Sequence, residues 1–350
     1  MKWNIKMKLK LLLFITTITF LFVSTIVRSN TLQEREIVVD GISYTSFKDA
    51  EGAIKDYSAI YLGPGIYKEG LHIRANNVWL TGDKDTHFVD AAIENKAAII
   101  VSGQNVTIET IECSDISVYT HNGACIRQQA GGLTLRNVYF HDSEQGVLQA
   151  HNTGDLTIEF SRFERLGQSG RAHAVYSHGS SLTIRDSIFL ASKDQGHEIK
   201  SRSKKTIIEN SLISSQLGDD SRLIDISDGG VLSINNSILH QGINSVNRQV
   251  IGFGLENLGR KREQSVIIEN SLIVMERPRG NEFLAINQKK RAQINLSVNG
   301  NIFVGSFTDS GNWQENNRIF NSRSEAQIPD DKLPEVRDLV TLLRVYRALR

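Results

Sequence analysis

Proline, cysteine, net charge and long apolar runs are all scarce in this sequence. Proline occurs 4 times and Cys 2 times in 350 residues, whereas glycine occurs 27 times. Many bends made without proline are typical of a β protein with frequent tight turns. The formal net charge of +1 lacks the basic excess of a dedicated nucleic-acid-binding protein, so we expect no nucleic-acid partner. After residue 27 no segment is long and apolar enough to span a bilayer.

The N-terminal segment differs from the rest of the chain. Residues 1–10 carry four lysines and precede an uncharged stretch at residues 11–27. A basic start followed by an apolar run is typical of a secretory signal peptide, which we place at residues 1–29. The 17-residue run is also near the lower limit for spanning a bilayer, so an uncleaved membrane anchor stays open. In both cases we expect a periplasmic or secreted protein, with membrane contact only through this segment.

The two cysteines are Cys113 and Cys125. In an exported chain an even count permits one disulfide, and two buried free thiols are the equal alternative. Neither cysteine has a histidine or a second cysteine at metal-ligand spacing, so the pattern predicts no zinc site.

One pattern recurs along the chain, as in "LTIRDSIF" and "TIIENSLI". Each copy begins with alternating apolar and polar residues, the period of a half-buried strand, and a polar residue interrupts at the fifth place. The copies begin at Val106, Leu133, Leu156, Leu182, Thr206, Leu232, Val266 and Leu296. The interrupting residues include Asn137, Asp186, Asn210, Asn236 and Asn270. Because Asn and Asp tolerate the left-handed backbone of a sharp bend, each unit is predicted as strand, corner and strand.

Repeats of this length are predicted to stack, since no single unit can bury its apolar face alone. The copies start 23 to 34 residues apart, which is too short for a four-stranded propeller blade, and they lack helical periodicity. The architecture that remains is a stack of coils made of short parallel strands. The pattern resembles the right-handed parallel β-helix of the pectin-lyase-like superfamily, which includes polysaccharide lyases and uronan C5-epimerases. The segment "AIYLGPGIYKEGLHI" resembles the entry coil of that superfamily.

The resemblance implies an all-β, single-domain solenoid with covered ends. We expect an N-terminal cap at residues 30–58, in which "SYTSFKDAEGAIKD" forms a helix, and the β-helix itself at residues 59–325. Residues 326–350 have apolar residues at helical spacing. They are predicted to form a C-terminal amphipathic helix that covers part of the solenoid, with a membrane or partner helix as the alternative.

A second series of strands precedes the repeated units: "ACIRQQ", "GVLQAH", "HAVYSH", "HEIKSR" and "RLIDIS". Side chains alternate across a strand. The predicted interior positions are Ile126, Leu148, Val175, Ile199 and Ile224. The predicted outward residues, here named the polar wall, are Arg127, Gln149, His151, Tyr176, His178, Lys200, Arg202 and Asp225, with His173, His197 and Arg222 at the strand starts. Five coils of this kind make a strip of roughly 20 Å.

We interpret the polar wall as a binding site for an anionic polysaccharide, because Arg and Lys bind carboxylates and the superfamily largely acts on polysaccharides. The predicted reaction removes the proton beside a uronic-acid carboxylate, giving elimination (a lyase) or inversion (an epimerase). Lys200 is the leading base candidate, because the flanking Arg202 and His197 favour a neutral amine. Tyr176 or His178 is the acid or an alternative base. The predicted substrate-binding residues are Arg127, Gln149, His151, His173, Arg222 and Asp225.

Other functions stay open at this stage. A glycoside hydrolase needs two carboxyl groups across the scissile bond, and Asp225 with Asp219, Asp220 or Glu198 is a candidate pair. A non-catalytic glycan-binding or structural surface protein would keep the cations without needing an acid and a base together, and an ordinary solvated face is the simplest alternative. No cofactor is required, although the aspartates at residues 219–228 leave a Ca²⁺ site open.

Overall fold

The computed structural model describes residues 35–258, 263–278, 280–308, 313 and 315–339. The predicted signal peptide or anchor lies outside these residues, as do residues 340–350 of the predicted C-terminal helix. Within the described ranges, no helix has the length and apolarity needed to cross a membrane.

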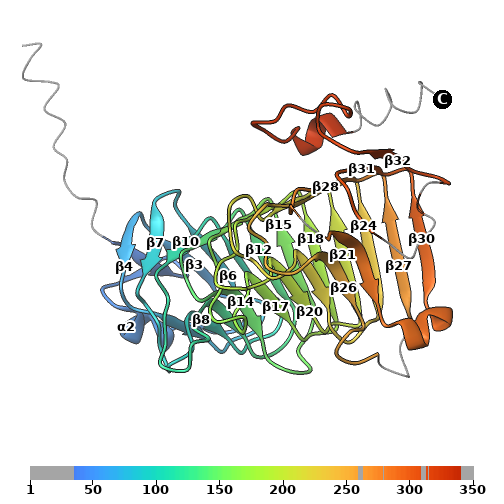
Figure 1. The fold of residues 1–350 in the computed structure, drawn as a ribbon. Helices are drawn as coiled ribbons and strands as arrows, with labels where there is room; N and C mark the ends of the chain where they lie inside the picture. The colour runs from blue at the N-terminus through green and yellow to red at the C-terminus, as the bar shows by residue number, and fades with distance from the viewer. Residues whose placement is uncertain (1–34, 259–262, 279, 309–312, 314, 340–350) are drawn as a thin grey trace, which may run out of the picture. The chain divides into compact units, whose positions relative to one another are not determined.

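The described residues form three sheets, labelled A, B and C, which the chain visits in turn (Figure 1). Sheet A runs in the order β2 (Ile42–Tyr44), β1 (Ile37–Val39), β3 (Ala59–Leu62), β6 (Trp79–Gly82), β9 (Val106–Glu109), β12 (Leu133–Arg136), β15 (Leu156–Glu159), β18 (Ser181–Arg185), β21 (Lys205–Glu209), β24 (Val231–Asn235), β27 (Ser265–Glu269) and β30 (Asn295–Asn299). Strand β1 pairs antiparallel with both β2 and β3, and the remaining pairs of this sheet are parallel.

Sheets B and C are parallel throughout the described chain. Sheet B comprises β4 (Gly65–Tyr67), β7 (Thr86–Val89), β10 (Glu112–Ser114), β13 (Tyr139–His141), β16 (Arg162–Glu164), β19 (Ile188–Leu190), β22 (Leu212–Ser214), β25 (Ile238–Gln241), β28 (Leu272–Met275), β31 (Ile302–Val304) and β32 (Arg318–Phe320). Sheet C comprises β5 (Leu71–Ile73), β8 (Ala97–Val101), β11 (Ala124–Gln128), β14 (Gln145–Gln149), β17 (Val175–Ser177), β20 (Ile199–Ser201), β23 (Ile224–Ile226), β26 (Gln249–Phe253) and β29 (Glu282–Ile286).

Equivalent residues of successive coils lie one above another, and this confirms the predicted all-β solenoid. Leu156 pairs with Leu133 on one side and Leu182 on the other. Alternate side chains point inward, and a row of phenylalanines fills the centre. Phe163 lies 5.3 Å from Phe140 and 4.6 Å from Phe189 between ring centroids. Burial of such stacked apolar rows is the main favourable free-energy term for a fold built from short strands.

The corners after sheet A have the backbone that the repeats predict. The interrupting residues Asn137, Asp186, Asn210, Asn236 and Asn270 have φ values between 49° and 53°. A serine follows most of these corners. The buried N–H of Ser187 donates to Oγ of Ser211 in the next coil, and Oγ of Ser187 donates to the carbonyl of Arg185. The same pairing joins Ser161, Ser187, Ser211, Ser237 and Ser271 in sequence.

Short helices flank the sheets. Helix α2 (Phe47–Glu51) begins at Ser46, whose hydroxyl accepts from the N–H of Asp49, and the Phe47 ring packs 5.6 Å from Tyr67. It is shorter than the predicted helix, since Gly52 ends it. The 3-10 helix η1 (Gln288–Gln293) precedes β30. Residues 336–339 are helical, and Leu339 packs among Ile238, Leu272 and other residues of sheet B.

Cys113 and Cys125 form a disulfide in the interior, between β10 and β11. Both residues are almost fully buried, with 2% and 0% exposure respectively. The sequence alone left this bond and two free thiols equally open.

Candidate functional site

The polar wall lies on sheet C, where three coils stack in the predicted register. Tyr176 pairs with Lys200, and Lys200 pairs with Asp225. The alternate positions Val175 and Ile199 are fully buried, as predicted. Because one coil takes about 25 residues here, stacking the coils brings residues that far apart in sequence onto one column.

Strand β14 pairs one residue away from the predicted register. Leu148 lies opposite Arg127 and Tyr176, so the outward position belongs to Leu148 rather than Gln149. The reason is that β14 begins with Gln145, which pairs with Ala124. Leu148 packs there in a small apolar cluster with the outward residues of β8 and β11, and Tyr176 borders this cluster.

The prediction that Gln149 faces outward is consequently wrong. Its side chain is 1% exposed and connects three coils. Oε1 of Gln149 accepts from Oγ of Ser177 at 2.6 Å and from the backbone N–H groups of His178 and Gly179. Nε2 donates to Oε1 of Gln128 at 2.8 Å. Gln149 satisfies buried polar groups, which is a structural role.

A concavity of about 530 Å³ opens over this part of sheet C. The predicted residues that line it are Arg127, His151, Tyr176, His178 and Arg202, together with the buried Gln149. The His178 ring centroid lies 4.3 Å from those of both His151 and Tyr176. Burial, followed by the positive charges of His151 and Arg202, lowers the pKa of His178 to about 4. The imidazole is therefore neutral near pH 7 and has a lone pair available.

The phenol of Tyr176 is held by its neighbour from the next coil. Nε of Arg202 donates to Oη of Tyr176 at 2.9 Å, and Nη1 donates to Oδ1 of Asp228 at 2.6 Å. The remaining nitrogen, Nη2, pairs with Glu256. Arg202 is thus fixed by several partners at once, and it fixes the direction of the phenol in turn.

Lys200 is an ion-pair partner in this structure. Its Nζ donates to Oε1 of Glu256 at 2.7 Å and lies 3.6 Å from Oδ2 of Asp225. It is absent from the lining of the concavity. An ammonium group paired with carboxylates has no lone pair for a C–H proton, so the geometry favours His178 over Lys200 as the base. Glu256 follows β26 and is 56 residues away in sequence, which is why the sequence pattern did not reveal it.

The remaining predicted residues support the wall from within. His173 is 1% exposed and His197 is 6% exposed. Nδ1 of His173 accepts from the backbone N–H of His197, and the two rings stack at 4.9 Å. Burial lowers the pKa of His173 well below its usual value and that of His197 to about 4. Asp225, 1% exposed, accepts from Nη1 of Arg222 at 2.8 Å. These four residues were predicted as surface positions, and pairing with one another keeps them covered.

Three of the four carboxyl groups of the hydrolase alternative, those of Glu198, Asp220 and Asp225, are buried. Glu198 and Asp220 are both 0% exposed. Burial raises the pKa of Asp220 to about 6 and that of Glu198 well above its usual value. Asp220 accepts from Oγ of Ser245, whereas Asp225 pairs with Arg222. The aspartates considered for Ca²⁺ therefore have separate partners in place of a shared ligand position.

Several residues of the concavity were missed at the sequence level. They are Thr120, His121, Asn122, Gln145 and Arg171. Most of them stand outside the strand segments that were aligned, in the connections before β11 and β17. Arg171 lies two residues before His173, so the cluster of cations around "GRAHAVYSH" was the available signal.

Comparison with known proteins agrees with the architecture. A family model for the right-handed beta helix region matches residues 76–216. No curated protein matches the sequence. The similar solved structures include pectate lyase Pel9A, with 14% identity, a TM-score of 0.45, and coverage of 83% of this chain and 76% of that chain.

Two further solved structures are similar. The GH136 lacto-N-biosidase from Eubacterium ramulus has 12% identity and a TM-score of 0.46, covering 80% of this chain and 65% of that chain. A mutant of the PL6 family alginate lyase AlyGC has 12% identity and a TM-score of 0.35, covering 78% of this chain and 50% of that chain. The three-sheet coil topology shows that the described residues form a parallel β-helix, and the match to the right-handed beta helix region over residues 76–216 agrees with that fold.

Proposed function

We propose that this protein is an exported lyase or C5-epimerase that binds an anionic, uronic-acid-containing polysaccharide on the polar wall. The observation that carries the proposal is the state of Arg127. Its guanidinium lines the concavity, burial lowers its pKa, and its Nε is buried without a hydrogen-bond partner. No ion pair joins Arg127 to an acidic residue in the described part of the chain. A half-buried cation without a counter-ion costs free energy, which an incoming carboxylate would offset.

The neighbouring side chains suit proton transfer beside that carboxylate. Arg127 neutralises the carboxylate and so acidifies the adjacent C–H bond. The neutral imidazole of His178 takes the proton. In a lyase, Tyr176, directed by Arg202, gives its proton to the leaving glycosidic oxygen on the same face as His178, and His178 then returns the proton to Tyr176, whose ring is its neighbour. In an epimerase, a solvent water on the opposite face gives the proton to the carbanion, and His178 returns its proton to solvent.

Export is supported by two independent features. The basic and apolar N-terminal segment is typical of a signal peptide or anchor. The Cys113–Cys125 disulfide belongs to an oxidising compartment, because cytosolic thiols are normally kept reduced.

Non-catalytic glycan binding is the second candidate. It is favoured by one observation, namely that Glu256 already pairs with both Lys200 and Arg202. Cations that are held in ion pairs give the polar wall a fixed shape, which suits binding, and leave Lys200 and Arg202 less available for reaction.

The decisive experiment is a screen of uronic-acid polymers, with polygalacturonate and alginate as the first probes. A rise in ultraviolet absorbance from the unsaturated product identifies a lyase, and inverted sugar stereochemistry by NMR without that rise identifies an epimerase. Arg127→Leu should abolish turnover and weaken binding. Arg136→Leu is the matched control, since Arg136 lies on sheet A and pairs with Glu159. Binding without any product would favour the second candidate, and absence of both would refute the proposal.

A further inference from the structure

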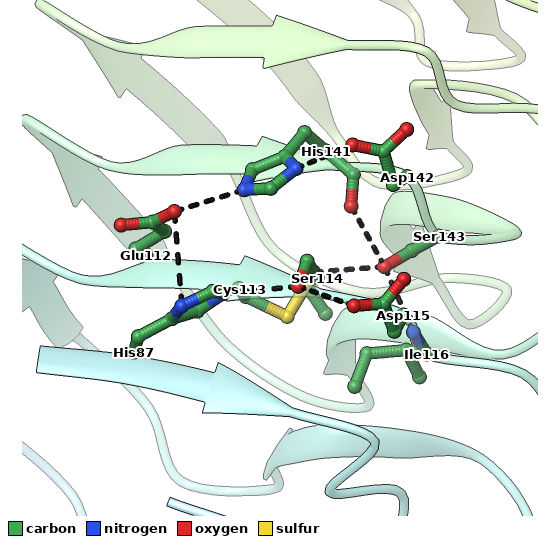
Figure 2. The surroundings of a disulfide bond; sticks show 10 residues. His87, Glu112, Cys113, Ser114, Asp115, Ile116, His141, Asp142 and Ser143 are labelled. Atoms are coloured by element: carbon green, nitrogen blue, oxygen red, sulfur yellow. Dashed lines mark hydrogen bonds and ion pairs between the residues drawn. A yellow bond between two sulfur atoms is a disulfide. The ribbon is translucent and has the colours of Figure 1, made fainter. Parts of the chain in front are cut away.

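Three side chains from consecutive coils converge on the outer side of sheet B. They are His87 on β7, Glu112 on β10 and His141 on β13 (Figure 2). Their ligand-type atoms all lie within 4.8 Å of one another. Nε2 of His141 is 3.0 Å from Oε1 of Glu112, and Nδ1 of His87 is 3.7 Å from the same oxygen. The three side chains are partly exposed, at 22%, 31% and 14%, so an ion can reach them from solvent.

Nδ1 of His141, the ring nitrogen that faces away from Glu112, already has a hydrogen-bond acceptor. Nδ1 of His141 lies 2.6 Å from Oδ2 of Asp142, and an ionised carboxylate can only accept, so Nδ1 carries the proton. Asp142 is fixed in this position by Arg165, whose Nε and Nη2 donate to its two oxygens at 2.8 and 2.7 Å. In the neutral imidazole the lone pair therefore lies on Nε2, which faces Glu112.

The outer nitrogen of His87 is held in the same way. Nε2 of His87 lies 3.0 Å from Oγ of Ser114, and that hydroxyl donates its own proton to Asp115 at 2.9 Å. The hydroxyl must then accept from Nε2–H of His87, which leaves the lone pair of His87 on Nδ1. Two imidazole lone pairs and one carboxylate oxygen thus point at a common position. In these neutral tautomers, neither imidazole ring has an N–H directed there.

We propose that His87, Glu112 and His141 form a binding site for a divalent transition-metal ion of the zinc type. Two imidazoles and a carboxylate are a ligand set that zinc accepts, with the fourth position left to solvent. Each histidine is oriented by a hydrogen bond from its other nitrogen, as metal-bound histidines usually are. Calcium and magnesium prefer ligand sets made of oxygen alone. The site belongs to sheet B and is independent of the function proposed for the polar wall on sheet C.

The backbone also favours a preformed site. Glu112 precedes Cys113, whose disulfide to Cys125 anchors β10 in the interior. His87 and Glu112 are paired residues of neighbouring strands, so their spacing is fixed by the sheet. The Tyr139 ring, which follows in the same column, stacks on His141 at 4.3 Å and limits its rotation. A ligand set on rigid strands loses little conformational entropy when it binds an ion.

The alternative without a metal is a protonated His141 that bridges Glu112 and Asp142. This alternative accounts for both short contacts of His141, but it gives Nδ1 of His87 no role.

The two arrangements are distinguished by direct titration with Zn²⁺ of the full chain, prepared without a histidine tag. We expect one Zn²⁺ per chain by calorimetry and elemental analysis. X-ray absorption at the zinc edge of the unmodified protein should show scattering from two imidazole rings.

Variants assign the ligands. His141→Gln, His87→Gln and Glu112→Gln should each weaken Zn²⁺ binding by at least tenfold, and Asp142→Asn by roughly 10- to 100-fold through its effect on His141. His72→Gln is the matched control, since His72 also pairs with a glutamate, Glu94, outside the cluster, and its affinity should be unchanged. Absence of stoichiometric binding, or zinc scattering without imidazole, would overturn the proposal even if the variants fail to fold.

Discussion

Nε of Arg202 donates to the phenolic oxygen of Tyr176 at 2.9 Å, across the gap between two successive coils. The same guanidinium also pairs with Asp228 and Glu256, so its plane is set by three groups. In the proposed mechanism, this contact directs the phenol of Tyr176 as the proton donor beside His178. It also connects the proposed acid, through Arg202, to Asp228 and Glu256.

The first prediction concerns the hydroxyl of Tyr176. On the polymer found by the screen, Tyr176→Phe should lower kcat/KM by roughly 100-fold or more, because a positioned general acid contributes on that scale. The loss of one hydrogen bond should change the free energy of unfolding by only about 1 kcal/mol. Tyr139→Phe is the control, since it loses a comparable bond to Glu164 on sheet B. Full activity in Tyr176→Phe would exclude the phenol as the acid.

The second prediction is a pH profile. A base works only when unprotonated, so the rate should fall as the pH drops through its pKa. Because burial lowers the pKa of His178 to about 4, kcat/KM should stay high down to about pH 5 and fall below it. His178→Gln should remove the activity together with this acidic limb. An acidic limb above neutrality would instead indicate a base such as Lys200.

The third prediction tests the interior role of Gln149. Gln149→Leu leaves the N–H groups of His178 and Gly179 without their acceptor, and each orphaned buried group costs about 1–3 kcal/mol. We expect a free energy of unfolding lower by roughly 2–4 kcal/mol, measured by thermal and urea denaturation. Gln129→Leu is the comparison, because Gln129 is only partly buried and, within the described part of the chain, its side chain accepts from Ser102 alone. Equal stability of the two variants would argue against the hydrogen-bond role of Gln149.

The fourth prediction concerns the disulfide. Replacing both Cys113 and Cys125 with alanine should lower the free energy of unfolding by about 2–3 kcal/mol, since the bond closes a short loop and restricts the unfolded chain. Intact-mass measurement before and after reduction in denaturant should show a gain of two hydrogens. Alkylation of both thiols in the denatured, unreduced protein would show that the bond is absent.

The repeats made most of the fold predictable. The corner residues Asn137 and Asp186 interrupt an alternating pattern, and both the period and the left-handed bend follow from that local chemistry. The interior column of Val175 and Ile199 was predictable for the same reason. Gln149 was not, because a pattern of polar and apolar residues assigns a glutamine to solvent even when neighbouring N–H groups satisfy it inside.

The candidate site was less predictable because its partners come from distant segments. Lys200 is separated from Glu256 by 56 residues and by a connection of irregular length, so no repeat places them together. Glu112 lies in the repeated unit that begins at Val106, His141 directly follows the unit that begins at Leu133, and His87 precedes the first copy. Single polar residues at such positions are common on exposed strand faces, so the sequence pattern did not single them out. Only the stacking of the coils shows that their ligand-type atoms lie within 4.8 Å of one another.

The serine contacts at the corners have a direction. Each corner N–H relies on the hydroxyl of the following coil, as Ser161 relies on Ser187, whereas each hydroxyl already has the carbonyl of its own coil. Removing coils from the C-terminal end therefore leaves a buried corner N–H without its acceptor. Removing coils from the N-terminal end leaves no N–H without an acceptor at these corners. At these serine corners the solenoid therefore has a direction, because each corner N–H finds its acceptor in the coil that is synthesised after it.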